Sequence, residues 1–260
     1  MRTTSNPAFK HLPAGGGYAN FDYGRTGLGG PTRSAPADAR PMTIDDVVTK
    51  TATTLALTIA TGALTYLGGS TAAILALPAA IVGLVLSLVI IFRKKVSPAL
   101  VIAYSAVEGV FLGGISYGIT AMAGISSGIV MQAIAGTIGV FAAMLVVYKT
   151  GAIRVTPKLT KWIIGAAAGC FVLMLVNLVA SFFVSGGLGL RDGGALGIGF
   201  SLLCIGVAAF SFLLDFDAAD RAIKGGVDAK VSWYIAFGLM TTLVWLYLEI
   251  LQLLASLQRN

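Results

Sequence analysis

Acidic side chains inside long apolar runs are the most unusual feature of this sequence. Asp215 and Asp217 follow the apolar run 196–214, and Glu249 is the only charged residue in the run 231–257. Runs of this length cross a bilayer as helices. An ionisable side chain in such a helix costs about 2.5 to 3.5 kcal/mol on insertion scales, so it is a functional candidate by default. The chemistry available to these carboxylates is the binding of protons and of hard cations.

Glu108 is a further acid inside an apolar run. On a helix it shares a face with Tyr104, Ser105 and Leu112, which predicts a polar strip that points into the protein. We interpret Glu108 as a candidate pore-lining residue. The alternative is a structural hydrogen bond to a neighbouring helix.

Composition places the chain in a membrane. Of its 260 residues, 57% are hydrophobic and 11% are charged, and the mean hydropathy is +0.88. A soluble domain carries about 25% charged residues. The chain has no Cys or His spacing typical of a metal site, and Cys170 and Cys204 both lie in apolar runs. We therefore expect no resident metal or other cofactor.

Two enzyme classes can be considered and set aside. The stretch from Gly114 to Gly118 matches the G-x-S-x-G pattern of a serine nucleophile, but it lies in a predicted membrane helix, and His11, the only histidine, lies far away in a polar segment. An intramembrane aspartyl protease needs two aspartates that share a proton, whereas Asp217 and Glu249 have the wrong composition. We expect a protein that is not an enzyme.

The hydropathy pattern predicts an all-α integral membrane protein with seven transmembrane helices. Residues 1–41 are rich in glycine and proline and are predicted to be a disordered tail, followed by a transmembrane domain over residues 42–260. Thr43, followed by Asp45 and Asp46, indicates the start of a helix. The apolar segments cover approximately 49–67, 70–92, 97–122, 127–148, 159–184, 196–217 and 231–257.

The distribution of basic residues predicts the orientation. Of the 18 Lys and Arg residues, all but Arg191 and Arg259 fall on one side of a seven-helix arrangement. By the positive-inside rule this side is cytoplasmic, so we expect a cytoplasmic N-terminus and an external C-terminus in the cell membrane. The net charge of +7 thus reflects membrane orientation, and we expect no nucleic-acid partner.

Three stretches together are similar to a known family. These are the Phe-Ser-x-x-x-x-Phe-Asp approach to Asp217, the Leu-Tyr-Leu-Glu-Ile-Leu sequence around Glu249, and the Gly-rich stretch 108–116. They resemble the Bax inhibitor-1 family, and more narrowly its bacterial branch, over roughly residues 45–257. The resemblance implies seven helices with the last one central and wrapped by the other six.

The resemblance also implies a pH-sensitive calcium leak that is governed by an acidic pair. Asp217 matches the first aspartate of that pair, and Glu249 takes the place of the second. Arg93 is the nearest match to the basic partner of the closed form, with Lys94 as the alternative. The chain departs from the family in having Glu at 249 and a longer spacing between the two acids. The pattern assigns no role to Asp215.

These observations combine into one functional hypothesis with two alternatives. Two carboxylates brought together in a site of low dielectric titrate as a pair, and Ca²⁺ competes with the shared proton. We predict a pH-gated cation pathway in which Asp217 and Glu249 bind Ca²⁺ transiently. The alternatives are a regulator that binds a membrane protease or another membrane protein, and a proton-coupled carrier of a small solute.

Overall fold

The computed structural model describes residues 40–93, 96–184 and 186–259, which lie within one compact unit, Ala39–Asn260. The prediction of a disordered tail over residues 1–41 falls outside the described residues, apart from Arg40 and Pro41. These two residues are ordered by the rest of the chain: Pro41 forms an isolated β-bridge with Asp228, and Arg40 accepts a backbone hydrogen bond of 3.0 Å from Ala229.

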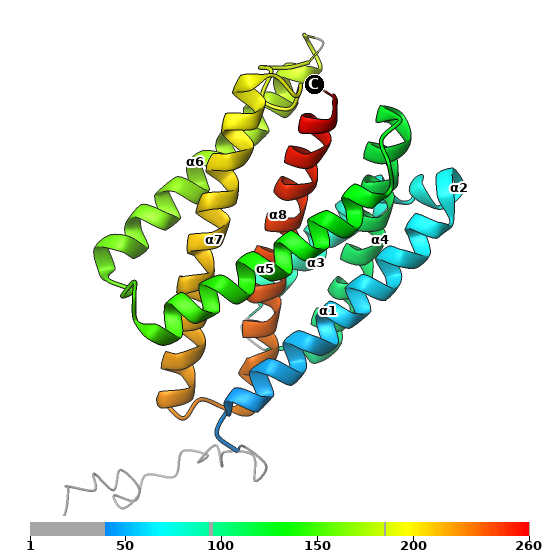
Figure 1. Cartoon of the computed structure of the whole chain (residues 1–260). Helices are drawn as coiled ribbons and strands as arrows, with labels where there is room; N and C mark the ends of the chain where they lie inside the picture. Colours follow the sequence, from blue (N-terminus) through cyan, green and yellow to red (C-terminus); the bar gives the residue numbers. More distant parts are fainter. Residues whose placement is uncertain (1–39, 94–95, 185, 260) are drawn as a thin grey trace, which may run out of the picture. The chain divides into compact units, whose positions relative to one another are not determined.

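The described residues form an all-helical protein, with seven helical spans that are long and apolar enough to cross a membrane (Figure 1). The helices are α1 (Ile44–Leu67), α2 (Gly69–Ala73), α3 (Ala76–Phe92), α4 (Pro98–Ala123), α5 (Gly128–Thr150), α6 (Pro157–Ser181), α7 (Ala195–Lys224), the short η2 (Ala229–Val231) and α8 (Ser232–Arg259). The prediction of seven transmembrane segments is confirmed. Helix α7 continues beyond its apolar run because residues 218–224 retain helix-forming side chains.

The start of α1 is fixed by a capping box, as the Thr-Asp pattern predicts. The Thr43 hydroxyl accepts a hydrogen bond from the backbone N–H of Asp46, whose carboxylate accepts one from the backbone of Thr43. The same carboxylate accepts two hydrogen bonds from Arg40, at 2.7 and 2.8 Å. Lys50, one turn further on, donates to the carbonyl of Ala229 at 2.8 Å. The beginning of α1 is thereby tied to the connection between α7 and α8.

The second span is broken into α2 and α3 at residues 74–75. Pro78 has no N–H to donate to the carbonyl four residues earlier, which is that of Ile74, so the regular helical ladder stops there. Proline is tolerated at its own position because it lies in the first turn of α3. The two pieces together make one span, Gly69–Phe92.

Helix α8 lies among four others. It packs against α7, α1, α5 and α4, whereas α3 packs chiefly on α4, and α6 on α7. The resemblance predicted a last helix wrapped by all six others, and this finer expectation is not confirmed. The main core cluster joins α7 to α8 through Phe212, Phe216, Leu243 and Leu246. Phe141 of α5 stacks edge-on against the two phenylalanines of α7.

Close helix packing occurs where α1 crosses α4. A Cβ atom at Gly109 would lie 1.9 Å from the Thr61 hydroxyl, and one at Gly113 would lie 2.2 Å from the carbonyl oxygen of Gly62. Glycine is therefore required at both positions. By contrast, a Cβ atom at Gly165 or Gly169 would meet nothing within 4 Å, so the GxxxG spacing of these two glycines serves no such contact.

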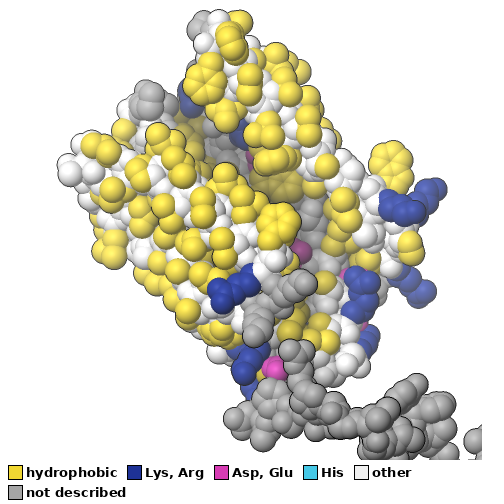
Figure 2. All heavy atoms as spheres, turned by 180° about the vertical axis from the view of Figure 1, so that it is seen from behind, with side chains coloured by type: hydrophobic (Ala, Val, Ile, Leu, Met, Phe, Trp, Pro, Cys, Tyr) yellow, Lys and Arg dark blue, Asp and Glu magenta, His cyan; other side chains and the backbone are white. Residues whose placement is uncertain are grey.

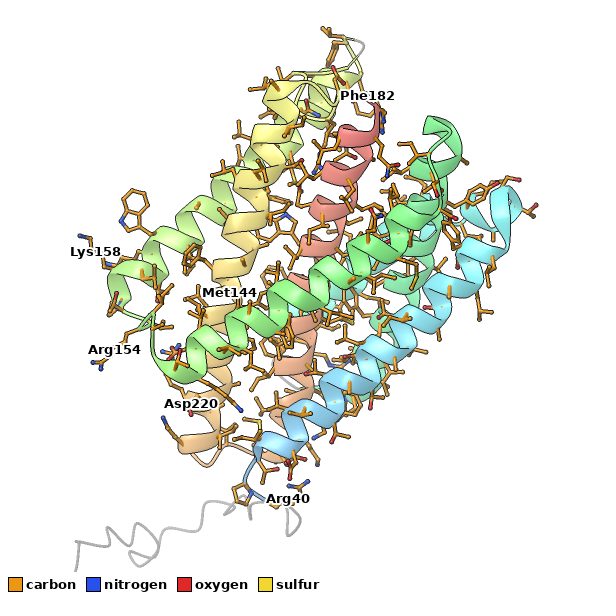
Figure 3. All side chains as sticks on the ribbon, in the orientation of Figure 1. Arg40, Met144, Arg154, Lys158, Phe182 and Asp220 are labelled. Atoms are coloured by element: carbon orange, nitrogen blue, oxygen red, sulfur yellow. The ribbon has the colours of Figure 1, made fainter. Side chains whose placement is uncertain are left out.

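The two ends of the bundle differ in charge. We call "basic end" the end that holds the start of α1 and the α3–α4, α5–α6 and α7–α8 connections, and "opposite end" the end with the α6–α7 connection and the end of α8. Figure 3 shows Arg40, Arg154 and Lys158 at the basic end and Phe182 at the opposite end. Among the described residues, only Arg191 and Arg259 are basic at the opposite end. Figure 2 shows an apolar surface over most of the rear face, as expected next to lipid.

Candidate cation site along α8

One face of α8 is less covered than the rest of the helix. Tyr234 and Thr241 are exposed, and Gly238 and Trp245 are half-buried, whereas most of the positions between them are buried. These four residues recur every three or four positions and so lie along one stripe. We call this the open stripe of α8. Figure 2 shows a hollow between two apolar lobes of the rear face, with an acidic side chain visible in it.

Asp215 approaches α8 from α7. Its carboxylate accepts a hydrogen bond of 2.7 Å from the hydroxyl of Thr242, next to the open stripe. The carbonyl oxygen of Gly238, in the same helix, lies 3.2 Å from the Thr242 hydroxyl and is the alternative acceptor for its single proton. Sequence alone did not show which of Asp215 and Asp217 faces the bundle. In the structure it is Asp215.

Glu108 approaches the same stripe from α4, on the other side. Only 8% of Glu108 is exposed, and the hydroxyl of Tyr104 lies within hydrogen-bonding reach of both its carboxylate and the Thr241 hydroxyl. A Cβ atom at Gly83 would lie 3.1 Å from a Glu108 oxygen, so α3 closes over the carboxylate. The predicted polar strip of Tyr104 and Glu108 therefore does point inward.

Asp215 and Glu108 lie at a similar depth. At about 1.5 Å per residue, each carboxylate lies about 15 Å along its own helix from the terminus at the basic end. Thr241 and Thr242 lie at about the same distance from the start of α8. The partners of both carboxylates are hydroxyl groups, and no ion pair among the described residues involves either acid.

Glu249 lies about 10 Å further along α8 than Thr242. It is 1% exposed, and its two oxygens accept hydrogen bonds from the guanidinium of Arg191, at 2.8 and 3.3 Å. Such a two-pronged pair is the strongest geometry open to Arg and a carboxylate. The indole of Trp245, on the open stripe, also lies within hydrogen-bonding reach of Glu249.

The α6–α7 connection holds Arg191 in place. The side chain of Gln252, one turn beyond Glu249, donates to the carbonyl of Arg191 at 3.2 Å. Asn177, near the end of α6, accepts a hydrogen bond of 2.9 Å from the backbone N–H of Leu188. Asn177 thus bonds to the connection that follows its own helix. Leu190 is buried in the cluster formed by α6 and α7.

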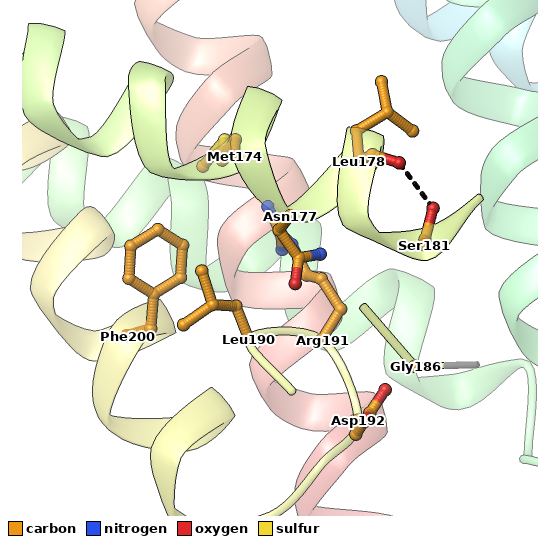
Figure 4. A pocket seen from close by; sticks show the side chains of 9 residues that line it. All are labelled: Met174, Asn177, Leu178, Ser181, Gly186, Leu190, Arg191, Asp192 and Phe200. Atoms are coloured by element: carbon orange, nitrogen blue, oxygen red, sulfur yellow. Dashed lines mark hydrogen bonds between the residues drawn. The ribbon is translucent and has the colours of Figure 1, made fainter. Parts of the chain in front are cut away.

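A cavity of about 410 Å³ adjoins Arg191 at the opposite end (Figure 4). Its wall is polar on one side, with Asn177, Ser181, Arg191 and Asp192, and apolar on the other, with Met174 and Phe200. In Figure 4 the side chain of Arg191 extends toward Asn177, and that of Asp192 points away from it. Arg191 remains 32% exposed in its ion pair.

The structure does not bring Asp217 and Glu249 together. Asp217 forms an ion pair of 2.8 Å with Arg221, one turn along α7, and the Arg221 side chain is 71% exposed. Because Asp215 already faces Thr242, Asp217 lies on a different side of α7, and Glu249 lies more than about 10 Å further toward the opposite end. The predicted joint site for Ca²⁺ at Asp217 and Glu249 is therefore not formed in this structure.

Arg93, the predicted basic partner, lies at the end of α3. It is exposed and lines a small cavity of about 20 Å³ together with Tyr234, the first residue of the open stripe. No ion pair in the described part of the chain involves Arg93. Lys94, the alternative, lies outside the described residues.

Arg191 is the functional candidate that the sequence analysis missed. It lies in the glycine-rich stretch between two apolar runs, and nothing in the pattern of those runs links it to Glu249. A signal was nevertheless present. Arg191 is the only basic residue in any connection on the side that is otherwise poor in positive charge, so its position departs from the trend of the whole chain.

The described residues contain no group of three or more His, Cys, Asp or Glu side chains that could hold a metal ion. The acids Glu108, Asp215 and Glu249 instead form separate sites, contributed by α4, α7 and α8, at two depths beside the open stripe of α8. Such an arrangement offers a passing cation one carboxylate at a time, with hydroxyl groups beside it.

Comparison with protein families agrees with the resemblance. A family model described as Bax inhibitor 1 like matches residues 6–259, which includes most of the glycine-rich segment that the resemblance left out. A comparison with curated proteins gives no match. The chain is a multi-pass membrane protein, and it belongs to the Bax inhibitor 1 like family.

Proposed function

We propose that this protein is a pH-sensitive calcium leak of the cytoplasmic membrane, and that the cation passes along the open stripe of α8. The observation that carries the proposal is the pairing of Glu108 and Asp215 with hydroxyl groups alone. We further propose that the basic end is cytoplasmic, because almost all basic residues lie there.

A buried carboxylate without a cationic partner needs another source of compensation. Inside a membrane its negative charge is costly, so it holds either a proton or a cation that diffuses to it. Hydroxyl groups of Thr242 and Tyr104 stabilise the site in both states, because a hydroxyl can donate to a carboxylate and can also offer its oxygen to a metal ion. Ca²⁺ prefers oxygen ligands of this kind.

The same argument gives the pH dependence. Protons and Ca²⁺ compete for the carboxylates, so flux should depend on the pH on both sides of the membrane. In this proposal the acidic groups that govern the competition are Glu108 and Asp215, in place of the Asp217–Glu249 pair that the resemblance implies. Glu249 contributes at the opposite end of the path.

Separate carboxylates favour conduction over storage. A cation held by a single acid and a few hydroxyl oxygens is bound weakly, and conduction requires sites that a cation can leave. A cage of several carboxylates would retain it. The spacing of about 10 Å between the level of Asp215 and that of Glu249 provides successive steps along the helix.

The test is calcium entry into dye-loaded proteoliposomes that contain the purified protein. We expect entry above that of empty liposomes, no accompanying chloride flux, and at least tenfold slower entry in the double variant Glu108→Gln/Asp215→Asn. Saturable uptake of a small solute without calcium entry would favour the carrier instead. Absence of any flux, together with capture of a membrane protein by the full-length chain, would favour the regulator.

A further inference from the structure

Glu249 differs from Glu108 and Asp215 because its compensating charge is supplied by the chain itself. We propose that Glu249 is a cation site that the guanidinium of Arg191 occupies in this structure. Residues 186–194 of the α6–α7 connection, which carry Arg191, would then act as the gate. The inference rests on the proposed function, since it assigns the closing element of the same path.

The first support is the position of the ion pair. Glu249 borders the open stripe of α8, beyond Trp245, and is 1% exposed beneath the arginine. A cation that moves along the stripe from Thr242 reaches Glu249 next. With both carboxylate oxygens bound to Arg191, the site is filled and carries no net negative charge.

The second support is the attachment of the connection. Gly186, Gly187, Gly189 and Gly193 have positive φ values of 62° to 87°, a backbone region that glycine adopts without strain. These residues let the connection fold back onto the ends of α6 and α8. Its contacts with α8 include the ion pair and the hydrogen bond from Gln252, and the ion pair is the stronger of these two.

The third support is space beside the arginine. The cavity of about 410 Å³ lies next to Arg191, and the arginine side chain is a third exposed. The guanidinium can therefore leave Glu249 without displacing packed side chains. The chemical class of ligand that replaces it is a small hard cation, because the vacated groups are carboxylate oxygens.

The proposal can be tested without measuring transport. In a background that carries Cys170→Ala and Cys204→Ala, a single thiol introduced as Leu190→Cys reports whether the connection is closed, because Leu190 is 8% exposed. Adding Glu249→Gln should speed labelling by a maleimide at least tenfold. The matched control is Asp217→Asn, which breaks an ion pair at the basic end and should leave the labelling rate unchanged. Equal rates in all three proteins would overturn the gate.

A reversible cross-link tests whether the connection controls flux. A Cβ atom at Gly193 would lie 3.8 Å from the Cβ of Ser256, close to the mean separation in a disulfide, so Gly193→Cys/Ser256→Cys in the same background should lock the connection onto α8. Gly193 has a φ of 81°, so a cysteine at this position is strained whether or not the disulfide forms. Flux through the oxidised variant is therefore compared with flux through the same variant in its reduced form. We expect calcium entry to fall at least tenfold on oxidation and to return on reduction.

The outcomes separate the gate from the path. If the oxidised protein conducts like the reduced one, the gate is wrong, while the carboxylate path stands. If no disulfide forms under oxidant, the connection does not rest on α8, and the gate is again wrong. If no protein in the series conducts but labelling responds to Glu249→Gln, the proposed function is wrong, and the ion pair still holds the connection shut.

Discussion

The two halves of α8 lie beside acids whose charges are compensated in different ways. In the half nearer the basic end, Asp215 and Glu108 meet hydroxyl groups from Thr242 and Tyr104. In the half nearer the opposite end, Glu249 meets a guanidinium. All three acids lie in spans that cross the membrane, so the cost of their charge is similar in kind. What differs is the group that compensates it.

This difference separates binding from closure. A hydroxyl partner leaves the negative charge of a carboxylate available to a proton or to a cation from solution. A guanidinium partner cancels the charge, and it can be removed only by moving the segment that carries it. A protein that has both kinds of partner beside the same helix can therefore bind a cation at one depth and exclude it at another.

The largest effect on stability is expected where the charge is already paired. Arg191→Ala leaves Glu249 buried and without a cation, and removing one partner of a buried pair costs about 3 kcal/mol, at the lower end of the usual range because Arg191 is partly exposed. Unfolding in mixed detergent measures this loss. The double variant Arg191→Ala/Glu249→Gln should recover most of it. No recovery would mean that the arginine stabilises the connection without its charge.

The next effect concerns pH. Protonation of Glu249 removes the charge that holds Arg191, so it should open the gate and raise flux. Protonation of Asp215 and Glu108, which have no cationic partner, should act in the opposite direction, because it removes the charges that attract the cation. In Glu249→Gln only this second effect should remain, so flux should fall continuously as the pH falls, from a value about tenfold above that of the wild type at neutral pH (about 1.4 kcal/mol). The other charged or titratable groups near Glu249 are Arg191 and the buried thiol of Cys204. A flux profile identical to that of the wild type would remove the distinction between the two halves.

The smallest effect is expected for the hydroxyl partners. Thr242→Val deletes the donor to Asp215 and keeps the shape of the side chain, so stability should fall by about 1 kcal/mol and flux by only a few fold. Thr53→Val is a suitable control, because Thr53 is exposed and donates only to the carbonyl of Thr49 in its own helix. A complete loss of flux in Thr242→Val would show that the hydroxyl group is itself an essential ligand.

The spans could be predicted because length and hydropathy alone determine them. The break between α2 and α3 has a similarly local cause, because Pro78 lacks the N–H that the helical ladder needs. The extension of α7 to Lys224 was not predicted, because residues 218–224 carry charges and fall outside the apolar run. Packing of α3 on α4 and of α6 on α7 depends on contacts far apart in the sequence, which no local pattern contains.

The acids of the site could be predicted for the same local reason, because a charge inside an apolar run is visible in the sequence. Their partners could not. Asp215 and Asp217 differ by a rotation of about 200° on one helix, and only the placement of α8 shows that Asp215 faces Thr242. The link between Arg191 and Glu249 spans two helices and a connection, so it depends on how the connection folds back.

The most direct test of the cation path compares the two neighbouring aspartates of α7. Calcium entry into dye-loaded proteoliposomes would be measured for the wild type, Asp215→Asn and Asp217→Asn at one neutral pH. If the path follows the open stripe, Asp215→Asn should reduce entry at least tenfold, whereas Asp217→Asn, whose residue pairs with the exposed Arg221, should conduct like the wild type. The opposite order, with entry lost in Asp217→Asn and kept in Asp215→Asn, would contradict the account and restore the pair that the resemblance implies.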